Sequence, residues 1–247
     1  MLAFISLIRF YDKMYRNRVE ANRVKKQIQI AIDGPAAAGK STIAKKAAEL
    51  LGYTYVDTGA MYRAITYKAL AENIDLQDEE KLTNLLNETK IALKPSPEGQ
   101  VVFLDNVAVT EEIRSKEVTS SVSAVAAHAT LRAEMVKRQM EMGKNGSIVM
   151  DGRDIGTHVL KDAELKIFMS ASVEERAKRR FLENQNRGIE TNLEELKRDI
   201  ALRDRLDSER QASPLIQADD AIYIDTTFLT VEEVSEKIMQ LAKERMT

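Results

Sequence analysis

The chain has 247 residues, a length that accommodates one α/β domain with a modest insertion but would crowd two full domains. Its formal net charge of −2, with 31% charged residues, argues against a general nucleic-acid binder, which would carry a broad basic excess. The absence of cysteine excludes disulfides, a thiol nucleophile and cysteine-bound metals. The two histidines, His128 and His158, lack the spacing of a metal motif, so we expect them to have surface or packing roles.

Residues 1–27 form a basic, partly apolar segment that differs from the rest of the chain. The apolar run 2–8 is too short to span a bilayer, and it lacks the flanking features of a secretion signal. We therefore expect no stable membrane insertion and a cytoplasmic protein. The segment either lies on an anionic membrane or a partner, or is a poorly ordered extension or the product of a misplaced start codon. The second interpretation is favoured, because a nucleotide-binding fold needs to begin only near Lys26.

An apolar strand at 28–33 runs into Gly-x-x-x-x-Gly-Lys-Ser and then into a helix over roughly 40–51. This motif predicts a phosphate-binding loop whose N–H groups wrap a phosphate, with Lys40 as a solvent-facing charge for the outer phosphates. Ser41 offers a hydroxyl to Mg²⁺, and the helix adds its positive N-terminal end. A simple close-packed turn is the weaker alternative, because the Lys-Ser pair and both flanking elements fit the motif. The predicted ATP-binding residues are Gly34, Pro35, Ala36, Ala37, Ala38, Gly39, Lys40, Ser41 and Thr42.

Strands and helices alternate beyond this loop, which predicts an α/β fold with a parallel sheet flanked by helices. The predicted core strands, each followed by a helix, are 28–33, 53–56, 147–150, 165–169 and 221–224. Two helix starts read as capping boxes, at Ser172–Glu175 and Thr230–Glu233. The last helix is expected to place one apolar face inward, made of Val231, Val234, Ile238 and Leu241.

The block 82–122 interrupts this alternation. Its runs 91–93, 101–104 and 107–109 predict short antiparallel strands, and Asp105-Asn106 predicts the tight turn between the last two. We interpret the block as a small inserted subdomain with antiparallel strands, lying over the substrate side.

Charged side chains recur just after the predicted strands, where ligands bind in open parallel sheets. Asp-Thr-Gly-Ala-Met-Tyr-Arg at 57–63 follows the second strand, and Asp-Gly-Arg-Asp-Ile-Gly-Thr at 151–157 follows the third. Further arginines lie within 176–180 and 203–210. One such run would ordinarily be a solvated face, but their repetition beside the phosphate loop predicts a second anionic substrate gripped by arginines. Met61 and Tyr62 we interpret as helix-core residues.

These motifs together resemble the bacterial cytidylate kinase (CMP kinase) family from about residue 28 to the C-terminus. Many enzymes share the phosphate loop, but its combination with the segments 57–63, 151–157 and 203–210 is far more specific. The resemblance implies the P-loop nucleoside monophosphate kinase fold. It also implies ATP- and Mg²⁺-dependent, direct in-line phosphorylation of CMP and dCMP in pyrimidine nucleotide metabolism, by an enzyme that we expect to be a monomer.

Site residues follow from the resemblance, position by position. Arg63, Arg153 and Arg210 match residues that contact the acceptor's phosphate, with the match to Arg203 nearby. Residues that read the cytosine edge match Ser123, Arg132 and Asp154. Asp207 matches a residue that holds the sugar, and Thr58 matches a position near the acceptor, where some members have Ser. Asp57, which precedes Thr58, is also among the predicted substrate-binding residues.

The resemblance also equates the block 82–122 with the family's nucleotide-monophosphate-binding region and residues 176–190 with its lid. The expected catalytic residues are Lys40, Arg153 and Arg180. Two interpretations of Arg180 stay open: it reaches the phosphates when the lid closes, or it only decorates a helix.

Phosphoryl transfer to a phosphate suits this composition, because an ionised acceptor oxygen needs neither a strong general base nor a covalent intermediate. A P-loop GTPase is disfavoured because the guanine-reading motif Asn-Lys-x-Asp is absent from the sequence. Two alternatives remain open: a non-catalytic nucleotide-binding module, and a kinase for another small acceptor such as UMP or shikimate.

Overall fold

The computed structural model describes residues 26–96, 99–144, 146–186 and 188–247, so the expectation for the basic segment 1–27 falls almost entirely outside the described residues. The strands are β1 Gln29–Asp33, β2 Thr54–Asp57, β3 Ile91–Ser96, β4 Gly99–Leu104, β5 Val107–Ala108, β6 Ile148–Gly152, β7 Leu165–Ser170 and β8 Ile222–Asp225. The α-helices are α2 Lys40–Leu51, α3 Thr58–Ala71, α4 Glu79–Glu88, α5 Lys116–Val125, α6 Ala129–Gly143, α7 Val173–Asn186, α8 Leu193–Glu209 and α9 Val231–Arg245. Two short helical turns are η1 Glu112–Arg114 and the π-helical η2 Ile155–Val159.

Five of the strands form a parallel sheet in the order β2-β6-β1-β7-β8, and β3, β4 and β5 form a separate antiparallel sheet. The predicted α/β fold is confirmed, because each predicted core strand is present. The register places Asp57 beside Asp151 and Asp33 beside Gly152. The carboxyl ends of β1, β2 and β6 therefore finish level with one another, at the edge of the sheet where ligands bind in such folds.

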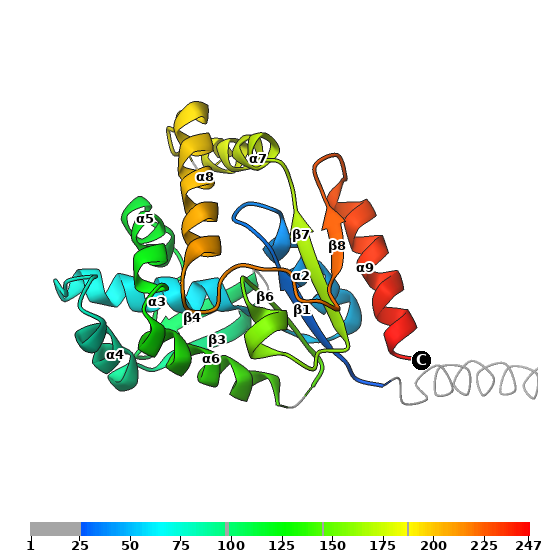
Figure 1. Ribbon diagram of the computed structural model, residues 1–247, viewed down its shortest axis with the longest axis horizontal. Coiled ribbons are helices and arrows are strands. Elements are labelled where there is room, and N and C mark those ends of the chain that lie inside the picture. The colour runs from blue at the N-terminus through cyan, green and yellow to red at the C-terminus, as the bar shows by residue number, and fades with distance from the viewer. Residues whose placement is uncertain (1–25, 97–98, 145, 187) are drawn as a thin grey trace, which may run out of the picture.

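Helices cover both faces of the parallel sheet (Figure 1). On one face, Ile30 and Ile32 of β1 belong to a core that also contains Ile43 of α2 and Ile238 of α9. On the other face, Ala31 belongs to a core with residues of β6 and η2, against which α6 packs. The alternation of side chains along β1 thus supplies both cores, which fixes the strand at the centre of the domain.

A helical lobe and the small antiparallel sheet lie together on the side of the molecule away from β8 and α9 (Figure 1). The lobe has its own apolar core, contributed by α3, α4, α5 and α6. The predicted turn between β4 and β5 is confirmed, since Asp105 and Asn106 both have positive φ, at 48° and 71°. This combination is typical of a two-residue hairpin. The predicted insertion 82–122 lies within this part of the molecule, and its role as a substrate-binding region stays a prediction.

Three local predictions are wrong. After β6 the chain forms the five-residue turn η2 rather than an α-helix, because only a short connection leads over the end of β1 to β7. The capping box at Thr230 is complete, but that at Ser172 is half formed: its hydroxyl accepts from Glu175 N, while its own N–H bonds to Thr227 Oγ1. Val231 is 40% exposed and does not share the buried face of α9.

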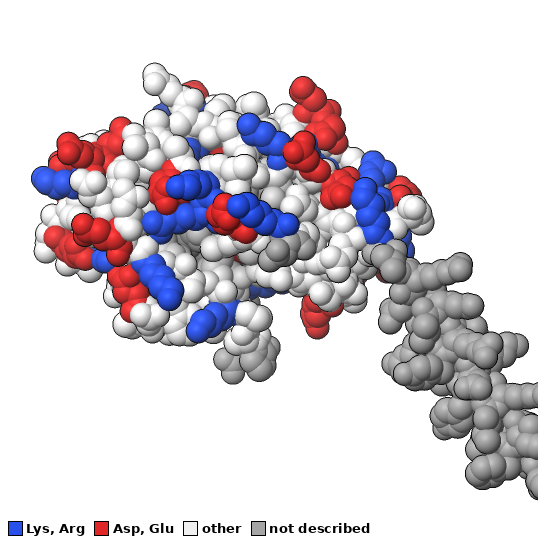
Figure 2. All heavy atoms as spheres, turned by 90° about the horizontal axis from the view of Figure 1, so that it is seen from below, with Lys and Arg blue, Asp and Glu red and all other residues white. Residues whose placement is uncertain are grey.

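Charged side chains of both signs are interspersed over the face seen in Figure 2, without a broad field of one sign. Across the described part of the chain, none of the helices combines the length and the apolar character needed to cross a bilayer.

Candidate active site

The loop after β1 has the backbone shape of a phosphate cradle. Gly34, Ala37 and Gly39 have φ values of 145°, 59° and 88°. A Cβ at Gly34 would lie 1.9 Å from the carbonyl oxygen of Met169, so only glycine fits there. Gly39 is the N-cap of α2, and no side chain of the described residues caps this helix through a hydrogen bond. The N–H groups of its first turn are therefore available to an anion.

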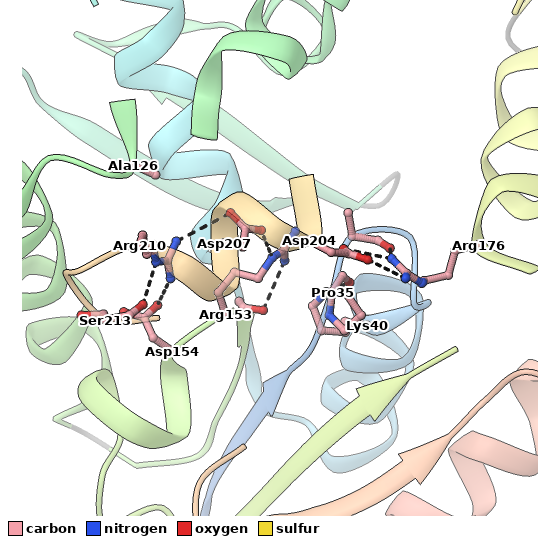
Figure 3. A network of polar contacts seen from close by, with 12 residues as sticks. Pro35, Lys40, Ala126, Arg153, Asp154, Arg176, Asp204, Asp207, Arg210 and Ser213 are labelled. Carbon is pink, nitrogen blue, oxygen red and sulfur yellow. Dashed lines mark hydrogen bonds and ion pairs between the residues drawn. The ribbon is translucent and has the colours of Figure 1, made fainter. Parts of the chain in front are cut away.

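Lys40 is the first residue of α2 and is buried, which corrects the expectation of a solvent-facing lysine. Its Nζ donates a 2.7 Å hydrogen bond to the carbonyl oxygen of Pro35, within the loop itself (Figure 3). Burial, reinforced by the positive charge of Arg153, lowers the pKa of Lys40 to about 7. A phosphate in the loop would offer the ammonium group a stronger partner than a carbonyl oxygen does.

Asp151 joins the loop to the end of the sheet. It is buried at the end of β6, where its two carboxylate oxygens accept hydrogen bonds from Ser41 Oγ at 2.9 Å and from the Tyr55 hydroxyl at 2.7 Å. Burial, together with the neighbouring charge of Asp57, raises the pKa of Asp151. The oxygens of Ser41 and Asp151 are the kind of ligand that Mg²⁺ prefers, alongside phosphates and waters.

A second cluster lies beyond β6, around Asp154. Its Oδ1 pairs with Arg132 at 2.8 Å, and both side chains are at most 4% exposed. Arg132 also donates to the carbonyl oxygen of Ala126 and lies 5.1 Å from the centre of the Tyr62 ring. The buried atoms Tyr62 OH, Arg132 Nε and Asp154 Oδ2 have no hydrogen-bond partner in the described structure. Because orphaned buried polar groups are costly, this cluster is suited to a polar ligand.

Arginines from three parts of the chain meet beside this cluster (Figure 3). Arg153 Nε pairs with Asp207 Oδ2 at 2.8 Å, and Arg210 lies 3.8 Å from the same carboxylate. Burial opposes the ionisation of Asp207, but Arg153 and Arg203 outweigh it and lower its pKa. Arg63 Nε, Arg203 Nε and Arg210 Nη2 have no hydrogen-bond partner in the described structure.

The proximity of several guanidinium groups also lowers the pKa values of two of the arginines. Burial, with Arg153 nearby, lowers the pKa of Arg203 to about 10. Burial, with Arg132 nearby, lowers that of Arg210 to about 10. A bound anion would relieve both effects by supplying the missing negative charge.

Asp57 orients Arg63 at the end of β2. Its Oδ2 accepts from Arg63 Nη2 at 2.8 Å, and its Oδ1 caps α3 by accepting from Ala60 N. Thr58 is buried and donates to the carbonyl oxygen of Asp151. The side chain of Ser123, on α5, is half-buried at the cleft.

One cleft of about 1740 Å³ brings most of the predicted residues together. Gly34 and Pro35 are not among the residues that line it. Those that line it are Ala36, Ala37, Ala38, Gly39, Lys40, Ser41, Thr42, Asp57, Thr58, Arg63, Ser123, Arg132, Arg153, Asp154, Arg180, Arg203, Asp207 and Arg210. Arg180 pairs with Glu183 of its own helix at 3.1 Å, so both interpretations of Arg180 stay open.

Sequence reasoning missed several polar residues of this region. Asp151 was inside a recognised motif, and its position directly after a strand was the available signal. Arg176 is buried and ties the loop to α8, donating to the carbonyl oxygen of Ala36 and pairing with Asp204 through two hydrogen bonds (Figure 3). Tyr62 lines the cleft rather than lying only in the helix core, whereas Met61 is fully buried as expected.

The family model and the similar sequences among known proteins indicate the same family. The sequence model of the family described as Cytidylate kinase matches residues 30–244. The chain is 64% identical over 223 residues to the cytidylate kinase of Lysinibacillus sphaericus (strain C3-41), an alignment that covers 90% of this chain and all of the relative. It is 59% identical to that of Geobacillus kaustophilus (strain HTA426), with the same coverage of both chains. Its identity to that of Bacillus subtilis (strain 168) is 57%, covering 90% of this chain and 99% of the relative.

Proposed function

The chain belongs to the cytidylate kinase family, and we propose that it transfers the γ-phosphoryl group of ATP to CMP, giving ADP and CDP. The observation that carries this proposal is the composition of the cleft. A phosphate cradle forms one side, and a group of buried or half-buried arginines and aspartates, several with buried polar atoms that lack a partner in the described structure, forms the other. Two anionic ligands can therefore meet between them.

The donor binds on the side of the loop after β1. Its phosphates accept from the N–H groups of the loop and of the first turn of α2, and Lys40 exchanges Pro35 for a phosphate oxygen. The hydroxyl oxygen of Ser41 and the carboxylate of Asp151, which are hydrogen-bonded to each other, are ligands that suit Mg²⁺. When bound, Mg²⁺ neutralises part of the charge of the phosphates.

The acceptor binds on the side of the arginines. Arg63, Arg153 and Arg210 hold its phosphate, and Arg203 adds charge beside them. Asp154 Oδ2 accepts from the amino group of cytosine, while Arg132 and Ser123 bind the rest of the ring edge. Asp207 holds the sugar, and we expect CMP and dCMP both to be substrates.

Transfer needs alignment and charge neutralisation rather than proton abstraction, because the attacking phosphate oxygen is already ionised. Lys40 and Arg153 stabilise the charge that spreads over the transferring group. Closure of the segments 82–122 and 176–190 over the cleft would exclude water and prevent hydrolysis of ATP. We expect the enzyme to act as a monomer in the cytoplasm.

A coupled assay of ADP formation tests this function. The purified protein is given ATP and Mg²⁺ with CMP, dCMP, UMP, AMP, GMP or shikimate, one at a time and with none. Consumption of ATP that depends on CMP, with dCMP next in kcat/KM, supports the proposal. Turnover with another acceptor in preference to CMP would replace it, and nucleotide binding without any turnover would favour a non-catalytic module.

A further inference from the structure

Asp154 is the N-cap of η2, yet its carboxylate makes no capping hydrogen bond. An N-cap aspartate ordinarily accepts from the N–H of the second or third helical residue. Here Oδ1 of Asp154 is 2.8 Å from Arg132 Nη2 and 4.0 Å from Arg210 Nη2. Figure 3 shows the Asp154 side chain directed toward Arg210. The first N–H groups of η2 therefore need another acceptor.

Asp33, the last residue of β1, supplies that acceptor. Its Oδ1 accepts from Ile155 N at 2.8 Å and its Oδ2 from Gly156 N at 2.7 Å. Asp33 is 5% exposed and is not among the residues that line the cleft. Gly156 allows this approach, since a Cβ there would lie 3.4 Å from Asp33 Oδ2 and 3.2 Å from the Lys166 side chain.

We propose that Asp33 is a positioning residue, which caps η2 in place of Asp154 and so keeps the Asp154 carboxylate free for the acceptor nucleotide. This inference rests on the proposed function. Without Asp33, two buried N–H groups would be left unsatisfied. Asp154 is the carboxylate at the start of the same helix, and turning back to cap it would withdraw Asp154 from Arg132 and from the acceptor.

The charge of Asp33 also interacts with that of Lys40. Asp33 could therefore act on the donor site through Lys40, and an experiment must separate this role from the capping of η2. Loss of the Lys40 interaction would disturb the donor and would affect every acceptor equally. Loss of the cap would act through Asp154 and would affect the acceptors differently. The ratio of kcat/KM for CMP to that for UMP therefore distinguishes the two roles.

The test compares Asp33→Asn with Glu164→Gln. Both replace a carboxylate that accepts from backbone N–H groups by an amide, but Glu164 binds Gln29 N at the opposite end of β1. For each variant, kcat and KM are measured for CMP, UMP and ATP. We expect Asp33→Asn to lower the CMP-to-UMP ratio at least about tenfold, with the KM for ATP within twofold of wild type. Glu164→Gln should leave the ratio unchanged.

Equal losses with both acceptors and a raised KM for ATP would overturn the inference in favour of the Lys40 role. Unchanged constants would overturn it as well. If Asp33→Asn does not fold, Gly156→Ala serves instead, because it removes no hydrogen-bonding group and its backbone does not have positive φ. The new Cβ would lie 3.2 Å from the Lys166 side chain and 3.4 Å from Asp33 Oδ2, so we expect a shift of the ratio in the same direction by a smaller factor.

A crystal structure of ligand-free Asp33→Asn, or of Gly156→Ala, tests the positioning role without reference to turnover. We expect Asp154 to have turned toward Gly156 N and to have left Arg132. An Asp154 side chain still paired with Arg132 would overturn the inference, even if CMP proved not to be the acceptor. Failure of the proposed function would instead appear as absent CMP turnover in the wild type.

Discussion

Asp154 and Arg132 form an ion pair 2.8 Å long in which only one oxygen of the carboxylate takes part. The other oxygen, Asp154 Oδ2, is buried without a hydrogen-bond partner among the described residues. Arg132 therefore occupies Oδ1 of Asp154 and leaves Oδ2 without a partner in the described part of the chain, and removing either member of such a buried pair is strongly destabilising. Asp154 Oδ2 can therefore accept a hydrogen bond from a ligand.

Replacing Asp154 by Asn tests whether this oxygen reads the base. Cytosine presents an amino donor at C4 and uracil a carbonyl acceptor, and an ionised carboxylate can only accept. The amide of Asn can turn to offer either function, so we expect the preference for CMP over UMP to narrow by at least about tenfold. Steady-state kcat/KM for both nucleotides measures this, with the exposed Asp162→Asn as the control. An unchanged ratio would leave Asp154 a structural partner of Arg132.

Lys40→Met removes the ammonium group from the phosphate loop while keeping a long apolar stem. We expect kcat to fall at least about 10² to 10³-fold, because a preorganised charge at the transferring group is lost. Circular dichroism should show an unchanged fold. Lys81→Met, at an exposed lysine of α4, is the control and should leave kcat as it is. Wild-type kcat in Lys40→Met would contradict the donor site.

The pH dependence of stability provides a separate test of Lys40. Its pKa in the folded protein is about 7, against an ordinary value of 10.5. Between these values the unfolded chain binds more protons than the folded one, so this lysine makes stability rise with pH. Lys40→Met lacks that contribution. The Tm of the variant minus that of the wild type, both ligand-free, should therefore decrease from pH 7 to pH 10. A flat or rising difference would mean that Lys40 stays fully charged in the cleft.

The phosphate loop and the core strands could be predicted because their signals are local. The spacing of Gly34, Gly39 and Lys40 specifies a loop and a helix start within a few residues, and α2 begins and ends where the sequence predicted. The turn at Asp105-Asn106 likewise depends only on two adjacent residues. The charged runs after the predicted strands indicated a second anionic ligand, and the resemblance to a family then suggested a separate role for each residue in them.

The contacts that could not be predicted join residues far apart in the chain. Asp33 binds a turn more than a hundred residues later, and Asp151 meets Ser41 and Tyr55 only because β6 lies between β1 and β2. Tyr62 belongs to the apolar core of the helical lobe as predicted, but it also lines the cleft, which the spacing of apolar residues does not reveal. Such partners depend on tertiary packing rather than on spacing along the sequence.

Gln100 connects the small antiparallel sheet to the acceptor side of the cleft. β2 is an edge strand of the parallel sheet, so its outer backbone groups lack a neighbouring strand. The amide of Gln100, from β4, accepts from Asp57 N at 3.2 Å and donates to the carbonyl oxygen of Tyr55 at 2.6 Å. Gln100 thus provides the hydrogen bonds that a neighbouring strand would otherwise make with β2. One of them is to Asp57, the residue that orients Arg63.

Gln100→Leu removes both hydrogen bonds and nearly keeps the side-chain size. We expect the free energy of unfolding to fall by about 1 to 3 kcal/mol, because two backbone groups of β2 lose their partners. The KM for CMP should rise several-fold, since Asp57 then holds Arg63 less firmly, while the KM for ATP changes less. Gln217→Leu is the control, because its amide donates to the carbonyl oxygen of Ala221 on the exposed surface. Equal increases in both KM values, or a loss of stability with unchanged KM for CMP, would show that Gln100 supports the fold without orienting Arg63.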